Sequence, residues 1–255
     1  MVTKVVIKDA KKSTVGYISD LKNFKNGTEF NFNPGVNIVV GENGSGKTTL
    51  MRLIERYLMV GYMRCERGKF NSNVKRLYGY GGAMLDGVDV FADYTRNTFR
   101  LSHAGEMKGE EAMGSMSDFS RLVTQSSSST GEGVVVALNS LFNYMFGKDA
   151  ELFFDYNQFK YTAPKYYDYI KEHQSSGDEW TVLMDEPDRN LSLENIGQIK
   201  SILSFHKPQT QVIAVIHNPL LIYSLSYNKD ANFVEMSRGY VNKVRKEVDK
   251  LIRKK

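Results

Sequence analysis

The sequence predicts a single α/β domain over residues 1–255, in which helices flank a mostly parallel core sheet. Short runs at 36–40, 181–184 and 211–216 have the continuous apolar character of buried parallel strands. A glycine-rich loop joins the first run to a helical pattern, and polar side chains follow the other two runs. Buried strands that alternate with helices are typical of an α/β fold.

A small antiparallel sheet is predicted at the N-terminus. Residues 5–7, 29–33 and 36–40 have the pattern of strands, and turn-forming Asn-Gly and Pro-Gly pairs lie between them. We expect these strands to lead into the core sheet. A helical subdomain is expected over about 62–145.

Residues 41–48 read Gly-Glu-Asn-Gly-Ser-Gly-Lys-Thr, which is a complete phosphate-binding loop. Its glycines lack β-carbons, so the backbone can curl with its N–H groups aimed at a phosphate, and the next helix adds its positive dipole end. Lys47 would reach the β- and γ-phosphates, and the Thr48 hydroxyl would bind Mg²⁺. The predicted nucleotide-binding residues are Asn43, Gly44, Ser45, Gly46, Lys47, Thr48 and Thr49.

Such a loop is convincing only between a strand and a helix. The run 36–40 supplies the strand. The apolar residues after the loop recur at helical spacing, and they are Leu50, Leu53, Ile54, Tyr57 and Leu58. These flanks argue against the alternative, a glycine loop with no ligand.

Two carboxylates follow the apolar run 181–184, namely Asp185 and Glu186. Adjacent strand positions point to opposite faces, so the two acids can take different roles. Asp185 would hold Mg²⁺ directly or through water, and Glu186 would activate the attacking water as a general base. His217 follows the run 211–216, and the carboxyl ends of parallel strands share one edge of a sheet. A purely structural histidine is the alternative for His217.

The segment 126–132 reads Ser-Ser-Ser-Ser-Thr-Gly-Glu, and by composition it is a flexible linker. A helical apolar stripe begins directly after it, with Val134, Val135 and Leu138 among its first members. A serine and glycine turn that opens a helix is a second candidate anion site.

Composition is that of an ordinary globular enzyme, with 41% hydrophobic and 25% charged residues. There is no long apolar run and no secretory signal, so we expect a cytoplasmic protein without membrane insertion. Cys65 is the only cysteine, which excludes an intrachain disulfide and a cysteine zinc cluster.

The net charge of +5 comes from the C-terminus, because residues 1–242 hold equal numbers of basic and acidic side chains. The segment 240–255 is predicted to be a basic amphipathic helix whose apolar stripe docks on the body. That stripe is Val241, Val244, Val248, Leu251 and Ile252. Contact with DNA through the basic side is the alternative.

An aromatic-rich insertion is expected over about 146–176, with nine aromatic side chains between 146 and 169. A local core formed by an added helix is the simpler interpretation. A docking surface for a partner protein is the functional one.

The stretch Leu21-Lys-Asn-Phe24, together with residues 30–47, resembles the opening of ATP-binding-cassette (ABC) ATPases. More narrowly it resembles the branch of P-loop NTPases that contains SMC, Rad50, RecF and related short ATPases without coiled coils. The resemblance implies ATP and Mg²⁺ as ligands, and it implies that His217 senses the γ-phosphate. It further implies a homodimer in which Ser129, Gly131 and Glu132 contact the ATP held by the opposite subunit, with Thr130 in place of the usual glycine.

The sequence departs from that family at two places. Ser192 occupies the position that an aspartate usually holds in the loop after the acidic pair. No glutamine lies between Lys47 and Gln125, where the family places a metal-binding one, so Asp93 or Asn97 is the candidate substitute. Adenine is expected near the N-terminal sheet, and the candidate stacking residues are Phe24 and Tyr17. A core position is the alternative for either ring.

The expected function is therefore an ATPase whose ATP-dependent dimer acts in DNA repair or in antiviral defence against foreign DNA. One alternative is an ATP-gated module that controls an effector protein. An energy subunit of a transporter is less favoured, because residues 133–138 lack the polar, arginine-bearing start that follows the transporter motif.

Overall fold

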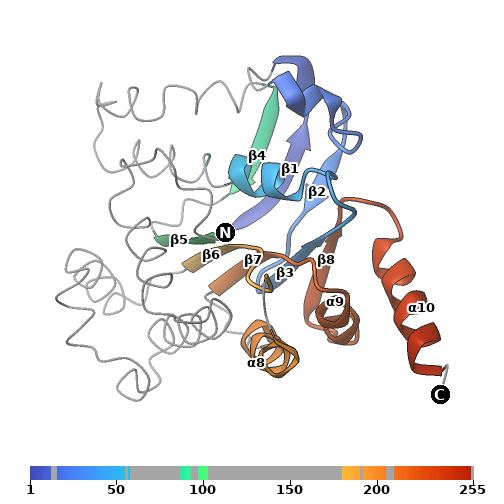
Figure 1. The fold of residues 1–255 in the computed structure, drawn as a ribbon. Helices are drawn as coiled ribbons and strands as arrows, with labels where there is room; N and C mark the ends of the chain where they lie inside the picture. The colour runs from blue at the N-terminus through green and yellow to red at the C-terminus, as the bar shows by residue number, and fades with distance from the viewer. Residues whose placement is uncertain are drawn as a thin grey trace.

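The computed structural model describes residues 1–12, 16–54, 57, 87–92, 97–102, 180–189, 192–204 and 210–253. Two sheets and the helices around them form this part of the chain (Figure 1). The segments 126–132 and 146–176 and Cys65 lie outside the described residues, so the predictions for them stay predictions.

The core sheet has five strands in the order β5-β6-β7-β3-β8, and every neighbouring pair is parallel. The strands are β5 (Asn97–Ser102), β6 (Trp180–Asp185), β7 (Thr210–Val215), β3 (Val36–Val40) and β8 (Ala231–Glu235). All residues of β3 and β7 are buried, as expected for strands that are covered on both faces. The predicted parallel core sheet is confirmed.

The second sheet has the order β2-β1-β4 and is antiparallel. It contains β2 (Glu29–Asn31), β1 (Val2–Ile7) and β4 (Val88–Ala92). The prediction that residues 36–40 belong to this sheet is wrong, because β3 pairs with β7 and β8 in the core sheet. The third strand of the antiparallel sheet is β4, which pairs with β1. Within the range 62–145, β4 and β5 are strands and the other residues are not described, so the helical subdomain stays a prediction.

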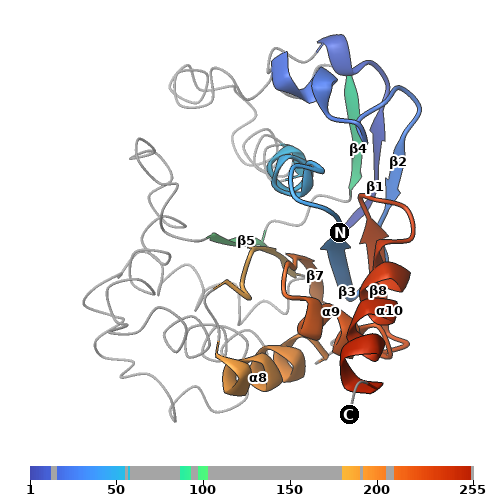
Figure 2. The ribbon, with the colours of Figure 1, turned by 45° about the vertical axis from the view of Figure 1, so that its right-hand side comes forward.

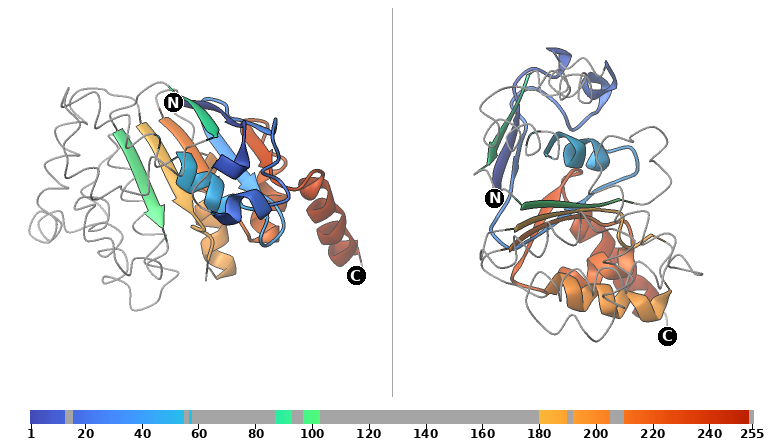
Figure 3. Two further views of the ribbon diagram at one scale, coloured as in Figure 1. Left: turned by 90° about the horizontal axis from the view of Figure 1, so that it is seen from above. Right: turned by 90° about the vertical axis from the view of Figure 1, so that its left-hand side faces the viewer.

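The helix at 47–54 lies between the two sheets (Figure 3). Its apolar side chains are almost fully buried against residues of both sheets, and they are Leu50, Met51, Leu53 and Ile54. Full burial of one such side chain contributes about 1.5–3 kcal/mol. This packing fixes the start of the helix, and with it the preceding loop, against the core sheet.

The opposite face of the core sheet carries α8 (Leu193–Ser204) and α9 (Pro219–Leu225), as Figure 2 shows. Each helix buries apolar side chains, and these are Ile199 and Leu203 of α8 and Leu221, Ile222 and Leu225 of α9. Two short 3-10 turns, η1 (Ala10–Lys12) and η2 (Gly16–Asp20), follow β1. In the described ranges, no helix is long and apolar enough to cross a membrane.

The basic C-terminal helix is confirmed as α10 (Tyr240–Arg253). Val244 and Val248 are buried, and the Tyr223 hydroxyl of α9 donates to Asp249 Oδ1 at 2.8 Å. Leu251 and Ile252, however, are 72% and 60% exposed. The prediction that the whole apolar stripe docks is therefore wrong for the last turn, because α10 extends beyond α9 there (Figure 1).

Candidate nucleotide site

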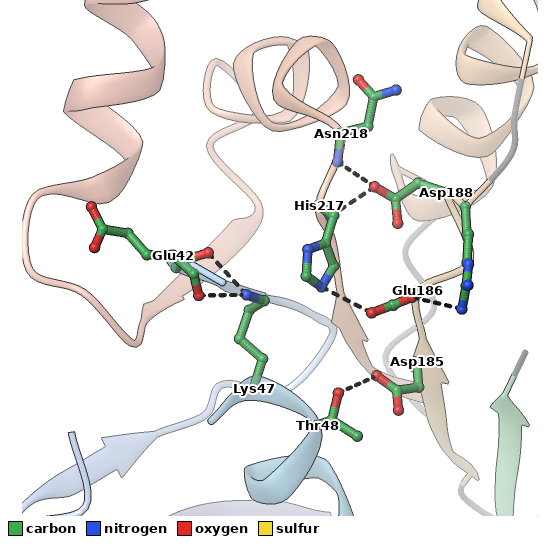
Figure 4. A network of polar contacts seen from close by, with 10 residues as sticks. Glu42, Lys47, Thr48, Asp185, Glu186, Asp188, His217 and Asn218 are labelled. Atoms are coloured by element: carbon green, nitrogen blue, oxygen red, sulfur yellow. Dashed lines mark hydrogen bonds and ion pairs between the residues drawn. The ribbon is translucent and has the colours of Figure 1, made fainter. Parts of the chain in front are cut away.

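Three segments meet at the carboxyl edge of the core sheet (Figure 4). The loop 41–46 follows β3, Asp185 ends β6, and His217 lies two residues after the end of β7. Because β7 lies between β3 and β6, the histidine is placed between the loop and the acidic pair. The topology thus brings together residues that lie more than a hundred positions apart in the chain.

The loop has a shape that requires glycine. Gly44 and Gly46 have φ values of 75° and 95°, in the left-handed region that other residues avoid. A β-carbon on Gly46 would collide with the ring of Phe24, and one on Gly41 would lie 2.8 Å from Ser45 Oγ. Of the other predicted loop ligands, Asn43 is exposed and Thr49 is buried. The exposed tip is the part that a ligand can reach directly.

Residues before β2 support the loop from outside. Asn23 Nδ2 donates to the Ser45 carbonyl at 3.1 Å. Phe24 is 1% exposed and packs against Phe30, with ring centroids 5.7 Å apart. Of the two interpretations of Phe24, the structure therefore supports a core residue and not a ring that stacks on adenine. Tyr17 is 45% exposed and remains a candidate for that role.

Lys47 is 4% exposed, and its ammonium donates to the carbonyls of Gly41 and Glu42, both at 2.9 Å. Burial lowers the pKa of Lys47, while the nearby carboxylates of Glu186 and Asp185 oppose that shift. The two carbonyl oxygens therefore replace hydrogen bonds that the buried ammonium would otherwise make to water. Phosphate oxygens, which carry more charge than carbonyls, would be stronger acceptors for this ammonium.

The predicted Mg²⁺ ligands Thr48 and Asp185 are in contact with each other. The Thr48 hydroxyl donates to Asp185 Oδ1 at 3.3 Å, and Asp185 is 7% exposed. Within the described ranges, no group of three or more His, Cys, Asp or Glu side chains could hold a metal ion. One hydroxyl and one carboxylate nevertheless fit Mg²⁺, because this ion prefers oxygen ligands and completes its shell with phosphate oxygens and water.

Glu186 lies just beyond β6 and has φ 56°, which makes it the one non-glycine residue with positive φ in the described chain. Its Oε1 is 3.2 Å from His217 Nε2, without the alignment of a hydrogen bond, and its Oε2 is 3.5 Å from an Arg189 nitrogen. The turn, rather than strand alternation, separates Glu186 from Asp185. The carboxylate therefore faces the histidine, as expected of a general base near the reacting groups.

The backbone of Glu186 provides a stability prediction. Left-handed backbone costs a non-glycine residue of order 1 kcal/mol. Glu186→Gly should therefore raise the free energy of unfolding above that of Glu186→Ala, by about 1 kcal/mol, since both variants lack the carboxylate and only glycine relieves the strain. Chemical denaturation of the two variants measures this difference. Equal stability would mean that the strain is no larger than the conformational entropy that glycine loses on folding.

Asp188 begins the loop after the acidic pair, and the sequence indicates no separate role for its side chain. Asp188 is 5% exposed, and its Oδ2 accepts hydrogen bonds from the backbone N–H groups of His217, at 2.7 Å, and of Asn218. An aspartate directly after Pro187 was the available sequence signal, but its partners come from another strand. Ser192 is exposed, and its Oγ accepts from the Asn195 N–H at 3.3 Å, as at a helix N-cap.

Of the two candidate substitutes for the missing glutamine, only Asn97 lies within the described residues. The register sets Asn97 level with Trp180 and Ser102 level with Asp185. Asn97 is thus at the amino end of β5, the wrong end of the strand for metal binding, and that prediction is wrong. Asp93 lies outside the described residues, as do Ser129, Thr130, Gly131 and Glu132.

A parallel sheet with this glycine loop, and with an acidic residue beside the loop threonine, defines the class of P-loop NTPases. A protein-family model for the AAA domain matches residues 17–186, which is more than half of the chain. The chain therefore belongs to the AAA domain family, and this membership supports ATP binding and hydrolysis in general, usually with Mg²⁺. The match covers the loop and the acidic pair and ends before His217. Among curated proteins, none matches this chain.

Proposed function

We propose that the protein hydrolyses ATP with Mg²⁺ between two copies arranged head to tail, and that dimer closure acts in DNA maintenance or in defence against foreign DNA. The observation that carries the proposal is the convergence of Lys47, the Thr48–Asp185 pair and the Glu186–His217 pair from three strands. The resemblance to SMC, Rad50 and RecF proteins supports the narrower role.

Each residue of the site has a separate task. Lys47 binds the β- and γ-phosphates, and the loop N–H groups surround them. Thr48 and Asp185 hold Mg²⁺, which when bound neutralises the charge that develops on the phosphates. Glu186 accepts a proton from the attacking water. His217 lies beside that carboxylate and would detect the γ-phosphate.

The reacting side chains are partly exposed, as closure by a second subunit requires. The side chains of Glu186 and His217 are 30% and 35% exposed, although the backbone around them is at the edge of the core. Hydrolysis is faster where bulk water is excluded and the attacking water is held in place. Ser129, Gly131 and Glu132 of the partner are the residues that we propose for this closure.

The dimer is tested with Glu186→Gln, which should bind ATP but hydrolyse it slowly. Since the bound nucleotide persists, ATP should convert this variant from monomer to dimer, and the mass from light scattering should double. Adding Lys47→Ala to the same variant is the matched control and should keep it monomeric. A Glu186→Gln protein that stays monomeric at saturating ATP would contradict the sandwich.

Two biological roles are the main candidates for this ATPase. DNA contact is favoured by α10, on which Lys246 and Arg253 are exposed and Lys243 joins the loop through Glu42 at 2.8 Å. The second candidate is an ATP-gated switch that binds or releases an effector protein. Hydrolysis that duplex DNA accelerates supports the first role. An ATP-dependent partner that co-purifies with Glu186→Gln, without DNA stimulation, supports the second, and co-fractionation with membranes would favour a transporter subunit.

A further inference from the structure

One buried carboxylate connects the two loops that carry the reacting pair. Asp188 follows β6 by three residues, and His217 and Asn218 follow β7. Its Oδ2 accepts from the N–H groups of both His217 and Asn218 (Figure 4). Its Oδ1 is buried and has no hydrogen-bond partner in the described part of the chain. The hydrogen bonding of this carboxylate is therefore concentrated on the backbone of the histidine loop.

The same loop is fixed on its other side by α9. Asn218 Oδ1 accepts from the N–H groups of Leu220, at 2.9 Å, and Leu221, at 3.2 Å, and so caps the helix. Asp188 thus holds the N–H groups of His217 and Asn218, and the Asn218 side chain holds those of Leu220 and Leu221. The position of the His217 ring, 3.2 Å from Glu186, follows from this arrangement.

Glu186 and Asp188 also belong to one turn, which the hydrogen bond from Arg189 N to Glu186 O closes at 3.1 Å. A movement of this turn would therefore shift the general base and the support of its histidine together. The hydrogen bonds of Lys47 go to the Gly41 and Glu42 carbonyls, and that of the Thr48 hydroxyl goes to Asp185. Asp188 acts on Lys47 through its negative charge, which favours the protonated lysine. Asp188 is thus placed to affect the histidine without holding the phosphate or metal ligands.

We infer that Asp188 is a positioning residue that holds His217 against Glu186 by accepting two backbone hydrogen bonds. This inference rests on the proposed hydrolysis at the same site. Burial raises the pKa of the Asp188 carboxyl, and the hydrogen bonds from Asn218 and His217 oppose that shift. Its task needs an acceptor oxygen rather than a charge, so the amide oxygen of asparagine can replace it.

The test compares Asp188→Ala with the conservative Asp188→Asn, each with and without His217→Ala. Loss of a residue that orients another typically costs about 10- to 100-fold. We expect Asp188→Ala to lower kcat by about that factor, with the KM for ATP within about twofold, and Asp188→Asn to restore most of it. In the His217→Ala background, Asp188→Ala should lower kcat little further, because Asp188 acts through the histidine that this background lacks. Additive losses, or a changed KM with unchanged kcat, would overturn the inference.

A second readout does not need turnover. In spectra of protein labelled with ¹⁵N-histidine, the His217 amide, assigned by its absence from His217→Ala, should be strongly downfield. It should move upfield in Asp188→Ala and stay in Asp188→Asn; an unmoved resonance in Asp188→Ala contradicts the inference. Should Asp188→Ala fail to fold, Asp188→Glu displaces the same acceptor and should show the same loss. Wild-type protein without ATP hydrolysis would refute the proposed function instead, and the amide shift would still decide the inference.

Discussion

Replacement of Lys47 by alanine is expected to remove nearly all affinity for ATP. In the structure the ammonium is buried and depends on two loop carbonyls, so phosphate would form charge-assisted hydrogen bonds with it in a desolvated place. Removing one partner of such a buried charged pair costs about 2–5 kcal/mol, which corresponds to roughly 30- to 5000-fold weaker binding. Titration calorimetry with ATP and Mg²⁺ measures the change.

Lys243→Ala is a matched control for this experiment. Both lysines contact Glu42, but Lys47 binds its backbone carbonyl from inside the loop and Lys243 binds its carboxylate at 2.8 Å from α10. Lys243 is 63% exposed, and exposed ion pairs contribute little. ATP affinity should therefore stay within about twofold for Lys243→Ala. An unchanged affinity in Lys47→Ala would mean that the loop does not bind nucleotide.

Replacement of Glu186 by glutamine is expected to slow ATP hydrolysis by about 10²- to 10⁴-fold, the usual contribution of a general base. Glutamine keeps the size of the side chain and its contact with His217, but its amide accepts no proton from water. ATP affinity should be preserved, because Lys47 and Thr48 are unchanged. Phosphate release measured at saturating ATP, together with calorimetry on the same samples, separates the two effects.

Arg189→Gln is the corresponding control. Arg189 also contacts the Glu186 carboxylate, at 3.5 Å, but it is 55% exposed and a weak partner. Its loss should change turnover by less than about fivefold. If Arg189→Gln and Glu186→Gln reduced turnover equally, hydrolysis would depend on the ion pair between the two residues and not on Glu186 as a proton acceptor. Full turnover in Glu186→Gln would mean that Glu186 is not the general base.

The proximity of the site residues could be predicted because each follows a local pattern. The glycines of the loop, the acidic pair and His217 all come directly after short buried runs, and parallel strands bring such ends to one edge. The pairing of β3 has no such local signal, because its partners are strands far along the chain. Strand pairing depends on which faces become buried, and that is decided by the whole fold.

Tertiary packing also explains the other differences. The aromatic ring of Phe24 is of the kind that stacks on a base. Because Gly46 has no β-carbon, however, this ring fills the core beneath the loop. Asp188 looks like an ordinary turn residue until β7 brings two N–H groups to it. Leu251 continues the helical stripe of α10 without a surface to meet it. None of these contacts has a signal in sequence spacing.

A crystal structure of Glu186→Gln grown with ATP and Mg²⁺ tests most directly whether these residues surround one nucleotide. The expected density shows the triphosphate in the loop, with the Lys47 ammonium moved from the Gly41 and Glu42 carbonyls to phosphate oxygens. Thr48 and Asp185 should lie on the metal ion, and His217 should face the γ-phosphate. Nucleotide bound elsewhere, with Lys47 still on the loop carbonyls, would contradict the assignment of this sheet edge as the site of ATP hydrolysis.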